Sequence, residues 1–300
     1  MQQNRQIKIA SINNVSKKFQ EKYVLTDISM EIYQGEVLSI LGPNGAGKTT
    51  LINMMLGCLS VTGGEISILG YQPGMIELKR QCGAMLQVSG LPDMSTVKEH
   101  IELFQSYYAN PMQYPRVIEL AGLEEIQNQY SKNLSGGQKQ RLLFALAICG
   151  NPRILFLDEP SVGMDIKTRK SLWKTIRELK KQGVSIVLTT HYLEEADQLS
   201  DRIIMLNQGR LIHEGTPDEI KSRINCKKIR FISSVPIDKF ISLQSADSTE
   251  CSGKYYEIQS NDSVQTLKNI FAITDDIADL SITGAALEDA FLLLNKESEM

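Results

Sequence analysis

Nine residues, Gly42 to Thr50, constrain this chain more than any other stretch. They read G-P-N-G-A-G-K-T-T and match the phosphate-loop pattern G-x-x-x-x-G-K-[ST]. Residues 37–41 before them, apolar except Ser39, predict a buried strand, and residues 49–56 predict a helix. This order places backbone N–H groups and the positive end of a helix dipole around one anion. We therefore expect an α/β protein built around a phosphate-binding site.

The side chains of the loop predict which phosphate compound binds there. Lys48 is placed to contact the β- and γ-phosphates of a nucleoside triphosphate, and Thr49 to offer its hydroxyl to Mg²⁺. The glycines let backbone N–H groups turn toward the phosphates, because no Cβ blocks the approach. The complete predicted set is Gly42, Pro43, Asn44, Gly45, Ala46, Gly47, Lys48, Thr49 and Thr50.

Two further apolar runs end in residues that can carry chemistry. Residues 154–157 are all apolar, which is typical of a parallel strand buried on both faces, and they lead into Asp158 and Glu159. Asp158 is expected in the Mg²⁺ shell, and Glu159 can orient or deprotonate the attacking water. The apolar strand predicted at 184–190 ends at His191, on the sheet edge where open α/β sheets bind ligands.

Three other positions allow more than one interpretation. The Ser135-Gly136 step at a predicted helix start offers backbone donors for a second anion, but it also fits an ordinary capped turn. Phe19 can stack on adenine or serve as a core or hairpin aromatic, and Tyr23 is the competing ring. Gln87 ends a short apolar run, and a lone Gln is usually a surface amide.

Composition excludes several classes of protein. The net charge of −3 gives no broad footprint for nucleic acid. The five cysteines form no C-x-x-C pair, so neither a metal nor a redox site is indicated, and a reduced compartment is expected. No apolar stretch approaches the roughly 18 residues of a membrane span, and the N-terminus lacks the apolar core of a signal peptide. We therefore expect any link to a membrane to come through a partner.

The last part of the chain alternates in short units. Strands are predicted at 229–232, 248–251, 255–258 and 277–282, with helices at 237–243, 264–271 and 287–294. This is the β-α-β-β-α-β order of a ferredoxin-like domain, followed by a closing helix. The predicted domain limits are 5–222 for the large domain and 227–300 for the small one.

Taken in order, the motifs resemble those of the ATP-binding subunits of ABC transporters. The resemblance covers roughly residues 5–222 and implies a P-loop ABC cassette with an antiparallel β subdomain and an inserted helical subdomain at about 88–150. Short phrases at 191–197, 215–217 and 286–291 are similar to the drug-resistance and sodium-efflux branch of bacterial exporters. The motifs that carry the family resemblance are Gly42–Thr50, Gln87, Leu134–Gln138, Asp158–Glu159, Ser161–Asp165 and His191.

The resemblance implies roles for the residues around the nucleotide. Phe19 would stack on adenine, and Gln87 would bind near Mg²⁺ and sense the membrane partner. Glu159 would be the catalytic base, and His191 would contact the γ-phosphate.

The resemblance also implies a head-to-tail dimer. Asp165 would lie at the dimer seam. A signature loop would cap ATP held by the other subunit, and it consists of Ser135, Gly136, Gly137 and Gln138.

The predicted function is an ATP-hydrolysing motor subunit that binds Mg-ATP between two subunits and drives a separate membrane permease, with export favoured over import. We expect it in the cytoplasm, bound to the inner face of the membrane through the permease. The second ATPase subunit is either another copy or a paralogue. A soluble ABC ATPase without a transport role is the alternative, although one phosphate loop and a short insertion disfavour the ribosomal and chromosomal versions. Glu159 and His191 disfavour a scaffold that does not hydrolyse ATP.

Overall fold

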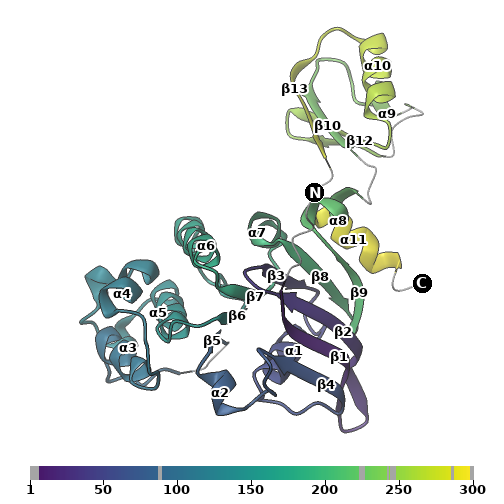
Figure 1. Cartoon of the computed structure of the whole chain (residues 1–300). Coiled ribbons are helices and arrows are strands. Elements are labelled where there is room, and N and C mark those ends of the chain that lie inside the picture. Colours follow the sequence, from purple (N-terminus) through teal and green to yellow (C-terminus); the bar gives the residue numbers. More distant parts are fainter. Residues whose placement is uncertain are drawn as a thin grey trace. The chain divides into compact units, whose positions relative to one another are not determined.

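The computed structural model describes residues 7–86, 90–222, 227–241, 243, 248–284 and 287–297. The chain forms two compact units, Met1–Thr216 and Pro217–Met300, whose elements are labelled in Figure 1. The sequence places the domain limit at residue 222, slightly further along the chain, and the limits 5–222 and 227–300 stay a prediction. Among the described residues, no helix has both the length and the apolar character needed to cross a membrane.

A six-stranded sheet forms the centre of the first unit, in the order β5-β6-β7-β3-β8-β9. Neighbouring strands are parallel except β8 and β9. Strands β3, β6 and β7 are buried along their whole length, as their apolar runs predict for strands covered on both faces. The strand bounds are β3 (Val37–Leu41), β5 (Cys82–Met85), β6 (Ile154–Asp158), β7 (Ser185–Thr190), β8 (Arg202–Asn207) and β9 (Arg210–Gly215).

Helices lie in the connections between the parallel strands, as is usual for the crossovers that such strands need. The phosphate loop lies between β3 and α1 (Lys48–Met55), and the short α2 (Ile76–Lys79) precedes β5. The crossover between β6 and β7 is α6 (Ile166–Lys181), and α7 (Leu193–Leu199) connects β7 to β8. The carboxyl ends of β3, β6 and β7 therefore meet at one edge of the sheet.

A second, antiparallel sheet in this unit has the order β2-β1-β4, with β1 (Lys8–Phe19), β2 (Lys22–Tyr33) and β4 (Gly63–Ile68). One face of it carries buried apolar side chains, such as Ile12 and Ile28, that share a core cluster with α1. This sheet is the antiparallel β subdomain that the resemblance predicts.

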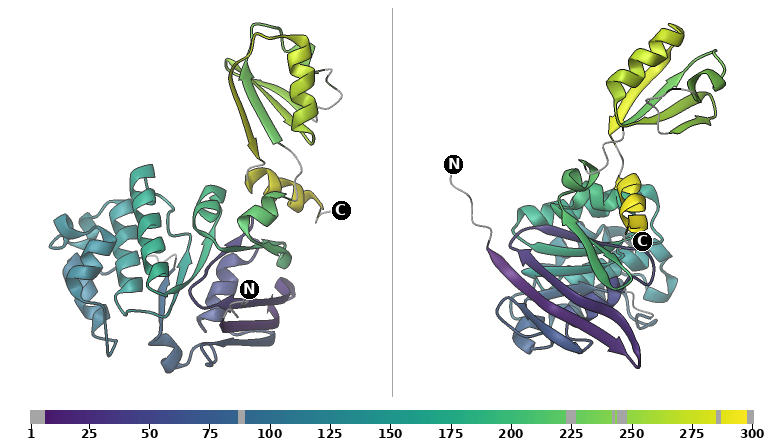
Figure 2. Two further views of the ribbon diagram at one scale, coloured as in Figure 1. Left: turned by 45° about the horizontal axis from the view of Figure 1, so that its top comes forward. Right: turned by 90° about the vertical axis from the view of Figure 1, so that its right-hand side faces the viewer.

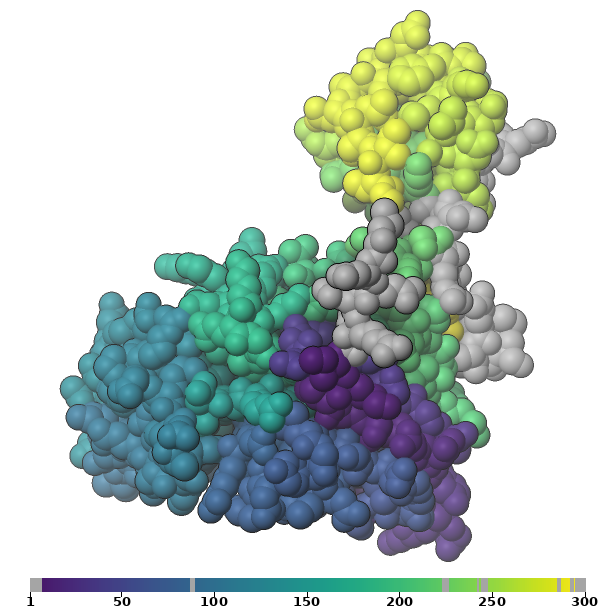
Figure 3. All heavy atoms as spheres, viewed as in Figure 1, coloured from purple at the N-terminus to yellow at the C-terminus, as the bar shows by residue number. Residues whose placement is uncertain are grey.

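Three helices form the inserted layer of the first unit: α3 (Val97–Gln105), α4 (Tyr114–Ala121) and α5 (Gly136–Ile148). Thr96 caps α3 through a reciprocal pair of hydrogen bonds with Glu99. Two 3₁₀ turns, at Glu124–Ile126 and Ser131–Asn133, connect α4 to α5. Figure 3 shows the blue and teal residues of this layer as one continuous lobe of the first unit.

The second unit contains a four-stranded antiparallel sheet in the order β11-β12-β10-β13. This is the strand order of the predicted ferredoxin-like plan, and α10 lies along one face of the sheet (Figure 2). Its core includes Phe231, Phe240 and Ile270, and elsewhere in the unit α11 packs against α8. The bounds are α8 (Pro217–Ser222), β10 (Lys227–Ile232), α9 (Asp238–Ile241), β11 (Ser248–Ser252), β12 (Tyr255–Ser260), α10 (Ser263–Ile273), β13 (Ala278–Gly284) and α11 (Leu287–Glu297).

Candidate functional site

The phosphate loop has a backbone shape that needs glycine at defined positions. Gly47 is left-handed, with φ 103°, and a Cβ added there would lie 2.6 Å from Cδ2 of Leu25. Gly45 is also left-handed, with φ 84°, but nothing lies within 4 Å of the place its Cβ would take. The loop is therefore closed against β2 at Gly47 and open at Gly45, where a ligand can approach the backbone.

The ammonium group of Lys48 lies back over this loop. Its Nζ donates to the carbonyl oxygen of Gly42 at 2.8 Å and to that of Pro43 at 3.2 Å. Nζ is also 3.9 Å from Oε1 of Glu159, and Lys48 is only 6% exposed. Burial lowers the pKa of Lys48, while the nearby Glu159 and Asp158 carboxylates oppose that shift. A buried cation thus lies where phosphate oxygens can replace two backbone carbonyls.

The carboxylate of Asp158 is held by two hydroxyl groups from other elements. Thr49 Oγ1 donates to Oδ2 at 2.9 Å, and Thr189 Oγ1 donates to Oδ1. The contact with Thr189 follows from strand pairing, because Asp158 on β6 is directly opposite Thr189 on β7. Asp158 is 2% exposed, so these bonds fix its orientation in a region with little water.

Sequence reasoning missed Thr189, which contacts both acidic residues. Besides its bond to Asp158, its hydroxyl accepts the N–H of Glu159 at 3.1 Å, and its carbonyl accepts the same N–H at 3.0 Å. In the sequence, Thr189 is marked only by its position near the end of an apolar strand. That position indicates a contact with the acidic residues only when β7 is known to lie between β6 and β3.

Glu159 links the lysine to the histidine. Its φ of 51° is left-handed, a strained conformation for a non-glycine residue. Its carboxylate has Oε1 near Lys48 Nζ and Oε2 3.2 Å from Nδ1 of His191. Lys48, Glu159 and His191 therefore form one continuous set of contacts, as their positions after β3, β6 and β7 predict.

A pocket of about 430 Å³ opens at this edge of the sheet. Phe19 and Tyr23 are not among its described lining residues, although the neighbouring Val24 is. Phe19 is 44% exposed and Tyr23 55% exposed, so either ring is accessible to a base, and the choice between them stays a prediction. The pocket is lined by Val24, Asn44, Gly45, Gly47, Lys48, Thr49, Thr50 and Glu159.

The signature residues lie at the start of α5, and none of them lines the described pocket. Ser135 Oγ accepts the N–H of Gln138 at 3.3 Å, and Gln138 Oε1 accepts the N–H of Ser135 at 2.8 Å, which is a capping box. A Cβ at Gly136 or Gly137 would have nothing within 4 Å. The packing of the chain itself therefore gives no steric reason for glycine at these two positions.

Asp165 is the N-cap of α6. Its carboxylate accepts the N–H of Thr168 at 2.9 Å and the hydroxyl of Thr168 at 2.8 Å, and these two bonds lower the pKa of Asp165. Gln87, the remaining predicted site residue, lies outside the described residues.

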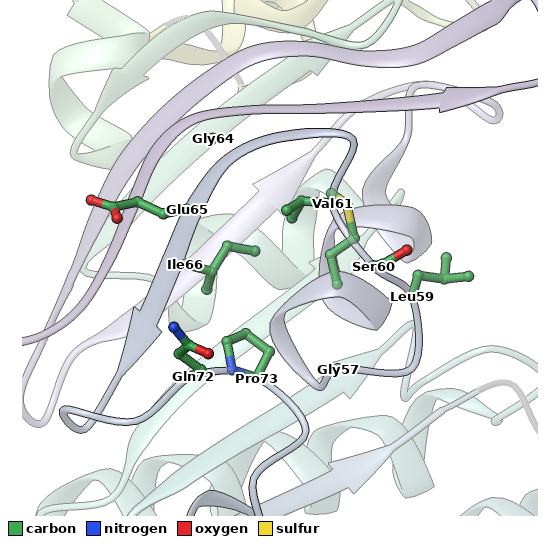
Figure 4. A pocket seen from close by; sticks show the side chains of 10 residues that line it. Gly57, Leu59, Ser60, Val61, Gly64, Glu65, Ile66, Gln72 and Pro73 are labelled. Atoms are coloured by element: carbon green, nitrogen blue, oxygen red, sulfur yellow. The ribbon is translucent and has the colours of Figure 1, made fainter.

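A second pocket, of about 390 Å³, is formed by the end of α1, the following loop and β4 (Figure 4). Its lining includes Met54, Ser60, Ile66 and Pro73, together with one carboxylate, Glu65. No residue predicted to bind the nucleotide is among its described lining residues.

The protein ligands for a metal ion are few. Within the ranges that the structure covers, no three His, Cys, Asp or Glu residues cluster closely enough to hold an ion by themselves. The adjacent Thr49 hydroxyl and Asp158 carboxylate are hard oxygen donors, which suit Mg²⁺ when phosphates and water complete its coordination.

Comparisons with known proteins agree with this geometry. The family described as ABC transporter matches residues 25–162. The chain is 39% identical over 230 residues to Nod factor export ATP-binding protein I of Rhizobium johnstonii, and the alignment covers 74% of each protein. A solved ATP-binding subunit of an ABC transporter has a TM-score of 0.66 and 28% identity, covering 72% of this chain and 92% of the other.

A second similar solved structure contains bound nucleotide. It is a dimeric ATP-binding cassette in a post-hydrolysis state with ADP and Pi, and it has a TM-score of 0.64 and 29% identity. The match covers 69% of this chain and 98% of that cassette. These similarities confirm the predicted cassette fold and the predicted family. The chain belongs to the ABC transporter family, as an ATP-binding subunit that is an ATPase.

Proposed function

We propose that this chain is the motor subunit of an exporter: it hydrolyses Mg-ATP between two head-to-tail subunits and drives a separate membrane permease. One observation carries the proposal, namely the contacts of Glu159 with Lys48 and His191 beside the Thr49–Asp158 pair. The export function in the name of the Rhizobium relative supports the direction of transport. In this proposal the chain acts in the cytoplasm, held at the membrane by the permease.

Binding would use the phosphate loop and the Thr49–Asp158 pair. Lys48 would exchange its bonds to the carbonyls of Gly42 and Pro43 for bonds to the β- and γ-phosphates. Thr49 and Asp158 would hold Mg²⁺, with Gln87 as a further ligand implied by the family resemblance. When bound, Mg²⁺ neutralises charge on the β- and γ-phosphate oxygens.

Hydrolysis would depend on Glu159 and His191. Glu159, one residue beyond the strand that ends in Asp158, would accept a proton from the attacking water as a general base. Nδ1 of His191 lies 3.2 Å from Oε2 of Glu159, so His191 would orient this carboxylate through Nδ1 and contact the γ-phosphate through Nε2. The N–H of Glu159 has two acceptors on Thr189, so its backbone is fixed relative to Asp158.

The second subunit would complete each site with its signature loop. Open space at Gly136 and Gly137 leaves room for phosphate to approach the first N–H groups of α5, a 13-residue helix. Ser135 and Gln138 would lie at the same contact, and Asp165 at the seam between subunits. The dimeric state of the solved cassette supports this arrangement. The partner subunit is a second copy or a paralogue.

A Glu159→Gln variant tests the shared site. It keeps the shape of the side chain but cannot accept a proton, so hydrolysis should fall by about 10²–10⁴-fold while ATP still binds. The variant should then accumulate as an ATP-dependent dimer, measured by light scattering with and without ATP.

Adding Ser135→Arg should abolish that dimer, whereas Ser222→Arg, on α8, should leave it intact. The mechanism is contradicted if Glu159→Gln remains monomeric under saturating ATP, both alone and in the complex with its permease. Purification with a membrane protein of about six spans separates the exporter from an ABC ATPase without a transport role.

A further inference from the structure

A chain of stacked side chains connects helix α6 to His191. The guanidinium carbon of Arg169 lies 5.5 Å from the ring centroid of Trp173 and 5.3 Å from that of Tyr192. The Tyr192 ring in turn lies 4.3 Å from the His191 ring, with 36° between the planes. We call Trp173, Arg169, Tyr192 and His191 the Arg169 stack. The contacts of Arg169 with Trp173 and with Tyr192 are cation–π contacts.

The guanidinium of Arg169 contacts two aromatic rings and one carboxylate. Among the described residues the guanidinium pairs with Glu194, at 3.5 Å from Nη2, and that carboxylate is 59% exposed, so the pair is screened by water. The Nε atom of Arg169 is buried and has no hydrogen-bond partner among the described residues. Stacking on Trp173 and Tyr192 therefore contributes to holding the guanidinium in place.

The two ends of the stack differ in character. Trp173 is 3% exposed, and its Nε1 donates to Oε1 of the fully buried Glu195 at 2.8 Å, so this end is fixed in the core. At the other end, Nδ1 of His191 contacts the Glu159 carboxylate. The position of the fixed end can therefore be transmitted through Arg169 and Tyr192 to the histidine.

Arg169 is also tied to the start of α6. Its backbone N–H donates to the carbonyl oxygen of Asp165, the residue that caps this helix, as one of the first i→i−4 hydrogen bonds of α6. A shift of the cap would thus move Arg169 directly, since one hydrogen bond joins them. The stack connects Asp165 on one side with the Glu159–His191 contact on the other.

We propose that Arg169 and Tyr192 are positioning residues: they hold the His191 ring against Glu159 and make its position depend on the Asp165 end of α6. The consequence for activity rests on the proposed roles of Glu159 and His191 in ATP hydrolysis. The placement of the ring itself does not depend on those roles, so the two ideas can be tested separately.

The first test observes the histidine ring directly. The chain has three histidines, so NMR of selectively labelled protein gives three ring signals, and His191→Ala identifies one of them. Arg169→Met removes the cation and Tyr192→Leu removes the ring, and both should shift the His191 signal while the other two stay in place. Tyr192→Phe is the matched control, because it keeps the ring and should leave the signal unchanged. A His191 signal that stays in place in folded Arg169→Met and Tyr192→Leu overturns the proposal.

The second test measures hydrolysis. A misplaced catalytic group can cost about 10²-fold in rate, so kcat in Arg169→Met and Tyr192→Leu should fall by about 10- to 100-fold while KM for ATP changes by less than about 3-fold. Tyr192→Phe should retain the parent kcat.

A double-mutant cycle shows whether Arg169 acts through His191. In a His191→Ala background, Arg169→Met should cause no further loss, because the group that it positions is gone. An equal fold-loss in both backgrounds overturns the proposal. A parent chain that fails to hydrolyse ATP would instead contradict the proposed function, and the NMR signals would still decide the positioning.

Discussion

The hydroxyl of Thr189 gives the sharpest test of how the acidic residues are held. Thr189→Val keeps the shape of this fully buried side chain and removes its bond to Asp158. A hydrogen bond to a charged group contributes about 1.5–3 kcal/mol. The N–H of Glu159 adds little to the loss, since it keeps the carbonyl of Thr189 at 3.0 Å. We therefore expect the free energy of unfolding to fall by about 1.5–3 kcal/mol. The ATPase rate should also fall, because the hydroxyl of Thr49 is then the one hydroxyl among the described residues that still bonds to Asp158.

The assay is urea unfolding followed by tryptophan fluorescence, which reports the first unit because Trp173 is the one tryptophan of the chain. Thr175→Val is the matched control. Its buried hydroxyl bonds to the carbonyl oxygens of Leu120 and Ser171, which are neutral, so a loss of about 0.5–1.5 kcal/mol is expected without an effect on hydrolysis. The reasoning is refuted if Thr189→Val costs no more stability than Thr175→Val and keeps the parent ATPase rate.

Three further outcomes are expected. Lys48→Ala should weaken the binding of ATP by about 10- to 100-fold, because it removes a charge-assisted contact to phosphate. The control Lys79→Ala, at an exposed lysine, should leave the affinity unchanged. Calorimetric titration measures both affinities. Phe19→Ala should weaken the binding of ATP by about 1–3 kcal/mol, the usual contribution of base stacking, and Phe19→Tyr should bind ATP nearly as the parent does. The same loss of affinity in Tyr23→Ala instead would identify Tyr23 as the stacking ring. Removing divalent cations with a chelator should weaken ATP binding as well as hydrolysis, and titration of Mg²⁺ should restore both; unchanged affinity would show that Asp158 does not act through a metal ion.

The parts of the site that the sequence predicts are those set by local order. Strand, glycine loop and helix follow each other directly, so the surroundings of Lys48 need no knowledge of the rest of the fold. Asp158, Glu159 and His191 follow two apolar runs, and parallel strands bring such ends to one edge. Their contacts in the structure agree with that expectation.

The parts that the sequence could not predict depend on which elements become neighbours. Thr189 contacts Asp158 because β7 pairs with β6, and no local pattern specifies that order. Arg169 is one of several cations in the sequence of α6, and only the approach of α6 to the segment after β7 places it on Tyr192. The choice between Phe19 and Tyr23 as the ring that stacks on adenine remains a prediction, because strand periodicity does not fix where an exposed hairpin ring points.

The charges of the site favour a bound cation in addition to its lysine. Asp158 and Glu159 contribute two negative charges and Lys48 one positive charge, so these three side chains carry a formal charge of −2 + 1 = −1. A nucleoside triphosphate brings several more negative charges to this site, where burial weakens the screening of charges by solvent. The glycine loop offers only partial positive charge from its N–H groups. A divalent cation beside Asp158 would change the formal charge of these groups from −1 to −1 + 2 = +1, and the binding of the triphosphate would then be electrostatically favourable.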